Sequence, residues 1–259
     1  MLDLLPVPAF DDNYLWLAAD AAGDAVAVDP GDAAPVRRAL AQRGWRLRAI
    51  LVTHHHDDHL GGVAALAGET GARVHAPVDE RIPYADERVA DGSRVVLDAP
   101  HVAFDVIGVP GHTRSHVAYH ADGLLFCGDA LFSLGCGRLF EGTPAQMLAS
   151  LDRLATLPAT TRVCCAHEYT LANAAFAASV EPGNPALQQR LAEVRQQRRR
   201  GEPSLPSTIA AERACNPFLR VDAPAVIAWC ARQGDAATRA ARFALLRTAK
   251  DQFRMPTGW

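Results

Sequence analysis

The chain has 259 residues, enough for one large domain or one domain with an appendage, and enough to bury a sizeable core. Hydrophobic residues make up 49% of it and charged residues 21%, which is ordinary globular composition. The formal net charge of −3 provides no global attraction to nucleic acid or to an anionic membrane. An anionic substrate would therefore need a local patch of cations.

Short apolar segments alternate with turns through the first two thirds of the chain. Residues 14–18 and 25–28 flank a Gly23-Asp24 turn and predict a hairpin. Residues 49–52 form a continuous apolar run, which is typical of a strand buried on both faces. Further strands are expected at residues 95–97, 102–109, 116–120, 124–127 and 163–166.

Helical signals lie between these strands and dominate after about residue 170. Residues 60–71 end on a glycine, a usual helix stop, and residues 143–146 have the pattern of a capping box. Strand signals then vanish, and Asn184-Pro185 begins an amphipathic helix. Asp222 and Asp235 are candidate N-caps for two more helices. We expect an α/β domain followed by a small helical domain, at residues 1–170 and 171–259.

Three features predict a soluble cytoplasmic protein. The first twenty residues carry acidic side chains and no basic leader, which is not typical of a signal peptide. No apolar run approaches the roughly 18 residues that a membrane-spanning helix needs. The cysteines form no CxxC pair, which favours buried thiols over disulfides. They are Cys127, Cys136, Cys164, Cys165, Cys215 and Cys230. We expect a monomer that binds a small molecule, with neither nucleic acid nor membrane as a partner.

The strongest chemical signal is the histidine motif, residues 53–59 (THHHDDH), which directly follows a predicted buried strand. Ligand sites in α/β folds gather at the carboxyl ends of such strands. His54 and His56 lie two apart in an extended turn and can point the same way, while Asp58 and His59 can face a second ion. Imidazole and carboxylate suit zinc, iron or manganese. The alternative, a solvated polar loop, is disfavoured by this concentration of histidine and aspartate.

Three more candidates follow predicted strands: His112 in a PGHT segment, Asp129 in CGD and His167 in AHE. Each alone is more typical of a hydrogen-bonded surface group than of a ligand. Their common placement after strands, together with the histidine motif, indicates one converging site. The His55 side chain is expected to point away from those of His54 and His56, so it is not expected to bind metal. Asp29 is a candidate to hydrogen-bond a metal ligand without binding the ion itself.

The segments THHHDDH, GHT, GDALF and AHEYT, in this order and spacing, resemble the metallo-β-lactamase superfamily. The ending at residues 245–256 is similar to that of the glyoxalase II family, the hydroxyacylglutathione hydrolases. Residues 12–14, 135–138 and 215–220 are similar to the same family. The resemblance runs across nearly the whole chain. It implies an αββα metallo-β-lactamase sandwich with a C-terminal helical domain that binds substrate.

The resemblance also implies two divalent metal ions between the sheets, zinc first, with iron or manganese as alternatives. A water bridging the ions would lose a proton near neutral pH and become the nucleophile, and Asp58 could orient it. One ion would be bound by His54, His56 and His112, the other by Asp58, His59 and His167, and Asp129 would bridge the two.

The activity implied by the resemblance is hydrolysis of S-(2-hydroxyacyl)glutathione. S-D-lactoylglutathione would give glutathione and D-lactate, the second step of methylglyoxal detoxification. By the same resemblance, Arg247 and Lys250 would bind the glycine end of glutathione, with Arg138 and Tyr169 lining the pocket. Without it, Arg247 and Lys250 would be assigned to a solvated helix face. Phe140 stands where some family members have a tyrosine whose hydroxyl contacts the substrate, so it is left out of the binding set.

Several alternatives stay open on sequence grounds. A lactonase or another thioesterase of the superfamily would keep the metal ligands and use a different C-terminal region. A persulfide dioxygenase with one iron would not need Asp58 and His167, which this chain retains. A nucleic-acid-binding protein or nuclease is suggested only by the arginines in residues 195–200, and the net acidic charge disfavours it. A catalytically inactive scaffold is disfavoured because no metal-ligand position is lost.

Overall fold

The structure is a computed structural model that describes residues 1–256. Contacts between residues divide the chain into two compact units. Unit 1 comprises residues 1–108, 115–128 and 164–167, and unit 2 comprises residues 109–114, 129–163 and the chain from Glu168 onward. The histidine motif therefore belongs to unit 1, whereas His112 and Asp129 belong to unit 2. The domain boundary at residue 170 remains a prediction.

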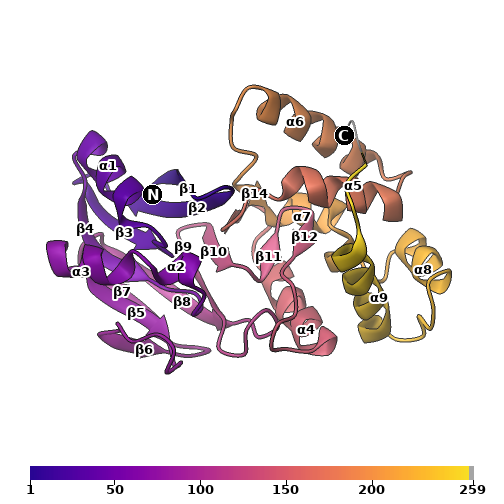
Figure 1. Cartoon of the computed structure of the whole chain (residues 1–259), viewed down its shortest axis with the longest axis horizontal. Helices are drawn as coiled ribbons and strands as arrows, with labels where there is room; N and C mark the ends of the chain where they lie inside the picture. The colour runs from indigo at the N-terminus through magenta and orange to yellow at the C-terminus, as the bar shows by residue number, and fades with distance from the viewer. Residues whose placement is uncertain (257–259) are drawn as a thin grey trace. The chain divides into compact units, whose positions relative to one another are not determined.

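Unit 1 contains a six-stranded sheet in the order β1-β2-β3-β4-β5-β6 (Figure 1). The predicted hairpin is confirmed: β2 and β3 pair antiparallel, with Trp16 opposite Val28. From β3 to β6 the strands run parallel, and β4 lies inside the sheet, which explains its continuous apolar run. The strands are β1 (Asp3–Ala9), β2 (Asn13–Ala19), β3 (Asp24–Val28), β4 (Arg46–Leu51), β5 (Arg73–Pro77) and β6 (Glu87–Val89).

The second sheet has the order β14-β13-β10-β9-β8-β7, and its strands from β10 to β7 lie in unit 1. Hydrogen bonds connect it to the first sheet: the Tyr119 hydroxyl donates to the Val52 carbonyl at 2.9 Å, and Trp16 Nε1 donates to the Cys165 carbonyl at 3.0 Å. The two sheets therefore face each other, as expected for this α/β fold class. The strands are β7 (Arg94–Leu97), β8 (Val102–Gly108), β9 (Val117–Ala121), β10 (Leu124–Gly128) and β13 (Arg162–Cys165), the last of which begins in unit 2.

Three helices of unit 1 lie beside the first sheet: α1 (Ala33–Arg43), α2 (Asp57–Leu60) and α3 (Val63–Thr70). The Asp32 side chain caps α1 by accepting from the Ala34 N–H at 2.8 Å. Gly71 ends α3 in the left-handed conformation, as predicted. Val36 and Leu66 pack with strand residues such as Ile50 in one buried cluster. The helices thus cover one face of the sheet, and its other face meets the second sheet.

Unit 2 combines short strands with helices. The predicted capping box is present at the start of α4, where Thr143 and Gln146 bond each other's backbone N–H groups. The strands are β11 (Leu131–Phe132), β12 (Gly135–Cys136) and β14 (Ser207–Thr208). The helices are α4 (Pro144–Ala155), α5 (Thr170–Val180), α6 (Pro185–Arg199), α7 (Ile209–Cys215), the 3-10 helix η1 (Pro217–Leu219), α8 (Pro224–Ala231) and α9 (Arg239–Gln252).

The predicted N-caps at Asp222 and Asp235 are wrong. Thr238 caps α9 by accepting from the Ala241 N–H at 3.1 Å, and α8 begins after Ala223 without a side-chain cap. Asp222 instead accepts hydrogen bonds from Arg239 and Arg242, because two guanidinium donors outcompete the backbone for its carboxylate.

The sequence analysis missed three strands of the first sheet, β1, β5 and β6, and also the short antiparallel pair β11 and β12. β14 was also missed, since strand signals were expected to end near residue 170. All six cysteines are buried thiols, as predicted. Within residues 1–256, no helix combines the length and apolar character needed to cross a membrane.

Candidate metal centre and adjoining pocket

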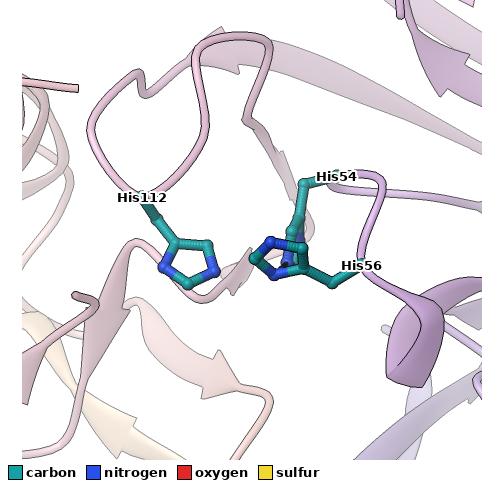
Figure 2. Close-up of side chains that lie close together, drawn as sticks. All are labelled: His54, His56 and His112. Atoms are coloured by element: carbon teal, nitrogen blue, oxygen red, sulfur yellow. Dashed lines mark hydrogen bonds between the residues drawn. The ribbon is translucent and has the colours of Figure 1, made fainter. Parts of the chain in front are cut away.

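The histidine motif leaves β4 as extended chain and then enters the short helix α2. His56, the residue before this helix, has extended backbone angles. This geometry puts His54 and His56 on one side, with Nε2 of His54 only 3.0 Å from Nδ1 of His56. Figure 2 draws these two rings and that of His112, the third imidazole predicted for the same ion. Two ring nitrogens of unit 1 thus point at a common place.

The orientation of the His54 ring is set by its neighbours in unit 1. The Thr53 hydroxyl lies 3.0 Å from His54 Nδ1 and donates to the Asp29 carboxylate at 2.7 Å. His116 stacks on His54 with ring centroids 4.6 Å apart. Gly128 must be a glycine here, because its φ is +46° and a Cβ atom would collide with the Thr53 hydroxyl. These contacts direct Nε2 of His54 toward His56.

Asp58, His59 and His167 converge within unit 1 from two segments far apart in sequence. Asp58 Oδ2 lies 3.4 Å from Nε2 of His59 and 3.4 Å from Nε2 of His167. Both imidazoles are buried, and the three donor atoms lie close enough to share one ion. The histidine motif supplies the first two residues, and the chain just after β13 supplies the third.

The pKa of the Asp58 carboxyl lies well below its usual value. Burial alone would raise this pKa, but hydrogen bonds with His167, His59 and Asn13 outweigh the burial. The carboxyl group is therefore ionised at neutral pH, which is the state that binds a cation.

Asp29 contacts both groups of unit 1. Its carboxylate accepts from His59 Nδ1 at 3.0 Å and from the Thr53 N–H at 2.7 Å. Asp29 also lies near enough to His54 and His59 to form a third possible metal triad. Because its oxygens are already used by these donors, we assign it to supporting the ligands, as the sequence analysis suggested. His55 faces elsewhere, with Nδ1 3.6 Å from the Asp79 carboxylate.

His112 and Asp129 come together in unit 2. His112 Nε2 lies 3.5 Å from Asp129 Oδ2, while His112 Nδ1 is 2.9 Å from the Arg138 carbonyl. Gly137 allows the two loops to pack closely, since a Cβ atom there would collide with the Asp129 carbonyl. Both side chains are buried. Contacts within unit 2 therefore position both side chains.

This donor set fits divalent metal ions. In His54, His59 and His167, Nδ1 contacts an oxygen atom of a neighbouring side chain, an arrangement typical of metal-binding histidines. Two aspartates, Asp58 and Asp129, add the negative charge that two divalent ions require. Nitrogen and oxygen donors of this kind suit zinc, iron and manganese and not a soft copper(I) site.

A pocket of about 420 Å³ lies in unit 2 and includes His112 and Asp129 in its lining. The pocket contains all four residues that the resemblance assigned to substrate. Its lining residues are His112, Asp129, Phe132, Cys136, Arg138, Phe140, Tyr169, Ala172, Asn173, Arg247 and Lys250.

Arg247 is 6% exposed, so it does not belong to a solvated helix face. Its guanidinium donates to the Cys136 carbonyl at 2.7 Å and to Asp251 at 2.9 Å. It also lies over the Phe218 ring, 5.2 Å from the centroid. Arg247 therefore braces the strand β12 in addition to lining the pocket.

Lys250 is half-buried in the same pocket. Burial lowers the pKa of its ammonium group, and the positive charges of Arg247 and Arg138 lower it further. Arg138 is more exposed, with Nε 3.7 Å from Asp251. The positive charges of Lys250, Arg247 and Arg138 outnumber the single negative charge of Asp251. This side of the pocket is therefore electropositive, which suits an anionic ligand.

Aromatic rings form another part of the lining. The Tyr169 and Phe132 rings lie 5.2 Å apart, and the Phe140 ring lies 5.1 Å from that of His112. Phe140 was left out of the predicted binding set because it has no hydroxyl group, yet it lines the pocket. Sequence reasoning also missed Phe132, the last residue of the GDALF segment, and Asn173, since neither side chain is charged or a usual metal ligand.

Two family models match consecutive parts of the chain. The model described as "Metallo-beta-lactamase superfamily" matches residues 11–167, and the one described as "Hydroxyacylglutathione hydrolase C-terminus" matches residues 168–253. A solved structure of TTHA1623 in a di-iron-bound form is 32% identical, with a TM-score of 0.54, and covers 63% of this chain and 91% of its own. The fold and the histidine–aspartate groups thus define a member of the metallo-β-lactamase superfamily.

Similarity to individual proteins is more specific. The hydroxyacylglutathione hydrolase of Stenotrophomonas maltophilia (strain R551-3) is 58% identical over 219 residues, or 84% of this chain and 85% of that protein. The hydroxyacylglutathione hydrolase of Cupriavidus taiwanensis is 53% identical over 98% of this chain and 100% of its own length. The chain belongs to the hydroxyacylglutathione hydrolase family.

Proposed function

We propose that this chain is an enzyme that hydrolyses the thioester of S-(2-hydroxyacyl)glutathione. The expected substrate is S-D-lactoylglutathione, and the products are glutathione and D-lactate. The observation that carries the proposal is the match of residues 168–253 to the C-terminal family model, because these residues supply Tyr169, Arg247 and Lys250 to the pocket. A superfamily hydrolase of another specificity would have no reason to carry this segment.

The pocket chemistry supports a glutathione thioester. Glutathione has two carboxylates, and Lys250 and Arg138 present positive charge where a carboxylate can reach it. Tyr169 and Phe140 provide apolar surface for the carbon chain between the charged ends. We assign catalysis to residues 1–170 and substrate binding to residues 171–259, with Arg138, Phe140 and Tyr169 as contributions from the first part.

We also propose that the site holds two divalent ions, zinc first. Bound ions would polarise the thioester carbonyl and supply hydroxide near neutral pH. The donor set supports this count, as does the di-iron-bound relative. One ion would be held by His54, His56 and His112, the other by Asp58, His59 and His167, with Asp129 shared between them.

Few protein side chains need to take part in the chemical step itself. The ionised Asp58 carboxylate accepts a hydrogen bond from the attacking water and orients it toward the carbonyl carbon. The departing thiolate is weakly basic, so the reaction needs no dedicated general acid. No covalent intermediate on cysteine is required, and burial raises the pKa of the Cys136 thiol in the pocket to about 11, which makes it a poor nucleophile.

We further propose that the enzyme acts in the cytoplasm as a monomer, on a small-molecule substrate. Six buried thiols support a reducing compartment, since oxidising compartments favour disulfides.

A substrate panel tests the proposal. The purified, zinc-loaded protein would be assayed with S-D-lactoylglutathione, with a lactoyl thioester of N-acetylcysteamine, and with a homoserine lactone. We expect the highest kcat/KM on the glutathione thioester by at least about tenfold, the scale of one charge–carboxylate contact. Faster turnover of the lactone or of the glutathione-free thioester would contradict it.

A further inference from the structure

The turn between β1 and β2 touches two of the predicted metal ligands, although it contains none itself. Asp12 Oδ1 accepts a hydrogen bond from His167 Nδ1 at 2.7 Å. Asn13 Nδ2 donates to Asp58 Oδ2 at 2.9 Å. Asp12 and Asn13 are adjacent in the chain, whereas Asp58 lies in α2 and His167 follows β13.

The backbone holds this turn firmly in unit 1. Asn13 pairs with His167 in an isolated antiparallel bridge, and the Tyr14 N–H donates to the Ala166 carbonyl at 2.6 Å. Phe10 adopts a φ of +51°, a conformation that non-glycine residues rarely adopt and that costs on the order of 1–3 kcal/mol. The chain thus accepts local strain in the segment that delivers Asp12 and Asn13.

Each contact constrains one ligand atom. A carboxylate on Nδ1 of His167 keeps the proton there, so that Nε2, which lies 3.4 Å from Asp58 Oδ2, is the electron-pair donor. The buried amide of Asn13 fixes the rotation of the Asp58 carboxylate, because it binds the same oxygen that both imidazoles approach. His59 has the equivalent support from Asp29.

The other histidine pair does not share this support. His54 has its Nδ1 against the Thr53 hydroxyl, which belongs to its own motif. The Asp12 and Asn13 side chains instead bond His167 and Asp58. Asp29 thus supports both predicted metal sites, whereas Asp12 and Asn13 contact the Asp58–His59–His167 site.

We propose that Asp12 and Asn13 are positioning residues for the Asp58–His59–His167 site, and that they set its metal affinity separately from that of the His54–His56 site. The inference rests on the proposed two-ion function. Its consequence is that the occupancy of one ion can be changed through the β1–β2 turn while the other ion keeps its affinity.

Zinc affinity, measured by competition with a zinc-binding dye, tests this without any activity assay. In a His56→Ala background, which leaves the Asp58 site, Asp12→Ala should weaken zinc binding about 10- to 100-fold, the usual effect of losing a residue that orients a metal ligand. In a His59→Ala background, which leaves the other site, Asp12→Ala should change affinity less than about threefold. Asn13→Ala should show the same contrast.

Two controls separate positioning from general damage. Asp11→Ala removes the same charge from an exposed residue of the same turn and should leave both affinities unchanged. Asp12→Asn keeps an oxygen acceptor for His167 and should recover part of the lost affinity. The urea unfolding of each metal-free variant shows whether the fold is intact; a structural role alone would lower metal-free stability and weaken both sites equally.

Equal loss in the two backgrounds, or no loss in the His56→Ala background, would overturn the inference. Failure of the proposed function is seen separately, since it would appear as absent thioesterase activity or as fewer than two bound zinc ions in the unaltered protein.

Discussion

Replacing Lys250 with alanine should weaken glutathione recognition while leaving the fold intact. The side chain is half-buried beside Arg138 and Arg247, where its loss removes one of three pocket cations. Losing one charge–carboxylate contact costs about 1–3 kcal/mol, which corresponds to about 5- to 150-fold in kcat/KM. If the contact is equally strong in ground and transition states, the loss appears mainly in KM.

Arg247→Ala should behave differently, because this guanidinium already bonds the Cys136 carbonyl and Asp251. Removing it leaves a buried carbonyl without its donor and a gap beside Phe218, which should lower the free energy of unfolding by about 2–4 kcal/mol. Its kcat/KM should therefore fall on every thioester, whereas Lys250→Ala should affect only those with glutathione.

The assay compares kcat/KM on S-D-lactoylglutathione and on the N-acetylcysteamine thioester, together with thermal unfolding and zinc content. Arg254→Ala, which removes an exposed cation a few residues further along the chain, is the matched control and should change nothing. Equal losses on both thioesters for Lys250→Ala, or no loss on the glutathione thioester, would refute the assignment of this pocket to glutathione.

Three further outcomes are expected. Asp129→Ala should lose metal from both sites because each ion loses a ligand and a charge; elemental analysis that finds two ions at normal affinity would exclude the bridge. Changing Cys127 and Cys136 to alanine should leave most turnover intact, and trapping an acyl-cysteine by mass spectrometry would contradict this. Burial raises the pKa of the Glu212 carboxyl in the folded protein above its value in the unfolded chain. The protonated carboxyl therefore contributes fully to the stability of the fold below the unfolded pKa, and this contribution is lost as the pH rises through the folded pKa. Glu212→Gln should therefore gain stability relative to the unaltered protein between pH 5 and pH 8 in urea unfolding; a constant difference would contradict it.

Much of what could be predicted about the site came from the spacing of residues that are close together in the sequence. His54 and His56 are two apart after a buried strand, so a short extended segment is enough to bring their nitrogens within 3.0 Å. The capping box at Thr143 is likewise a pattern of four neighbouring residues. Such features depend on few atoms outside the segment itself, and the same holds for the β2–β3 hairpin.

Contacts between segments far apart in the chain could not be predicted from the sequence. Asp12 meets His167 across 155 positions and Asn13 meets Asp58 across 45, so neither pairing has a local pattern. The burial of Arg247 depends on Phe218 and Cys136, which the helix α9 cannot reveal by periodicity. Asp222 failed as a predicted cap for the same reason, since the arginines that bind it follow 17 and 20 residues later.

The most direct test of the account is hydrolysis of S-D-lactoylglutathione in water enriched in oxygen-18, with the zinc content varied by chelation and restoration. We expect one heavy oxygen in the carboxylate of each D-lactate released, one thiol per lactate, and a rate that rises and falls with bound zinc. Undiminished turnover after the metal has been removed, or no thioester cleavage by the zinc-loaded protein, would contradict the central claim.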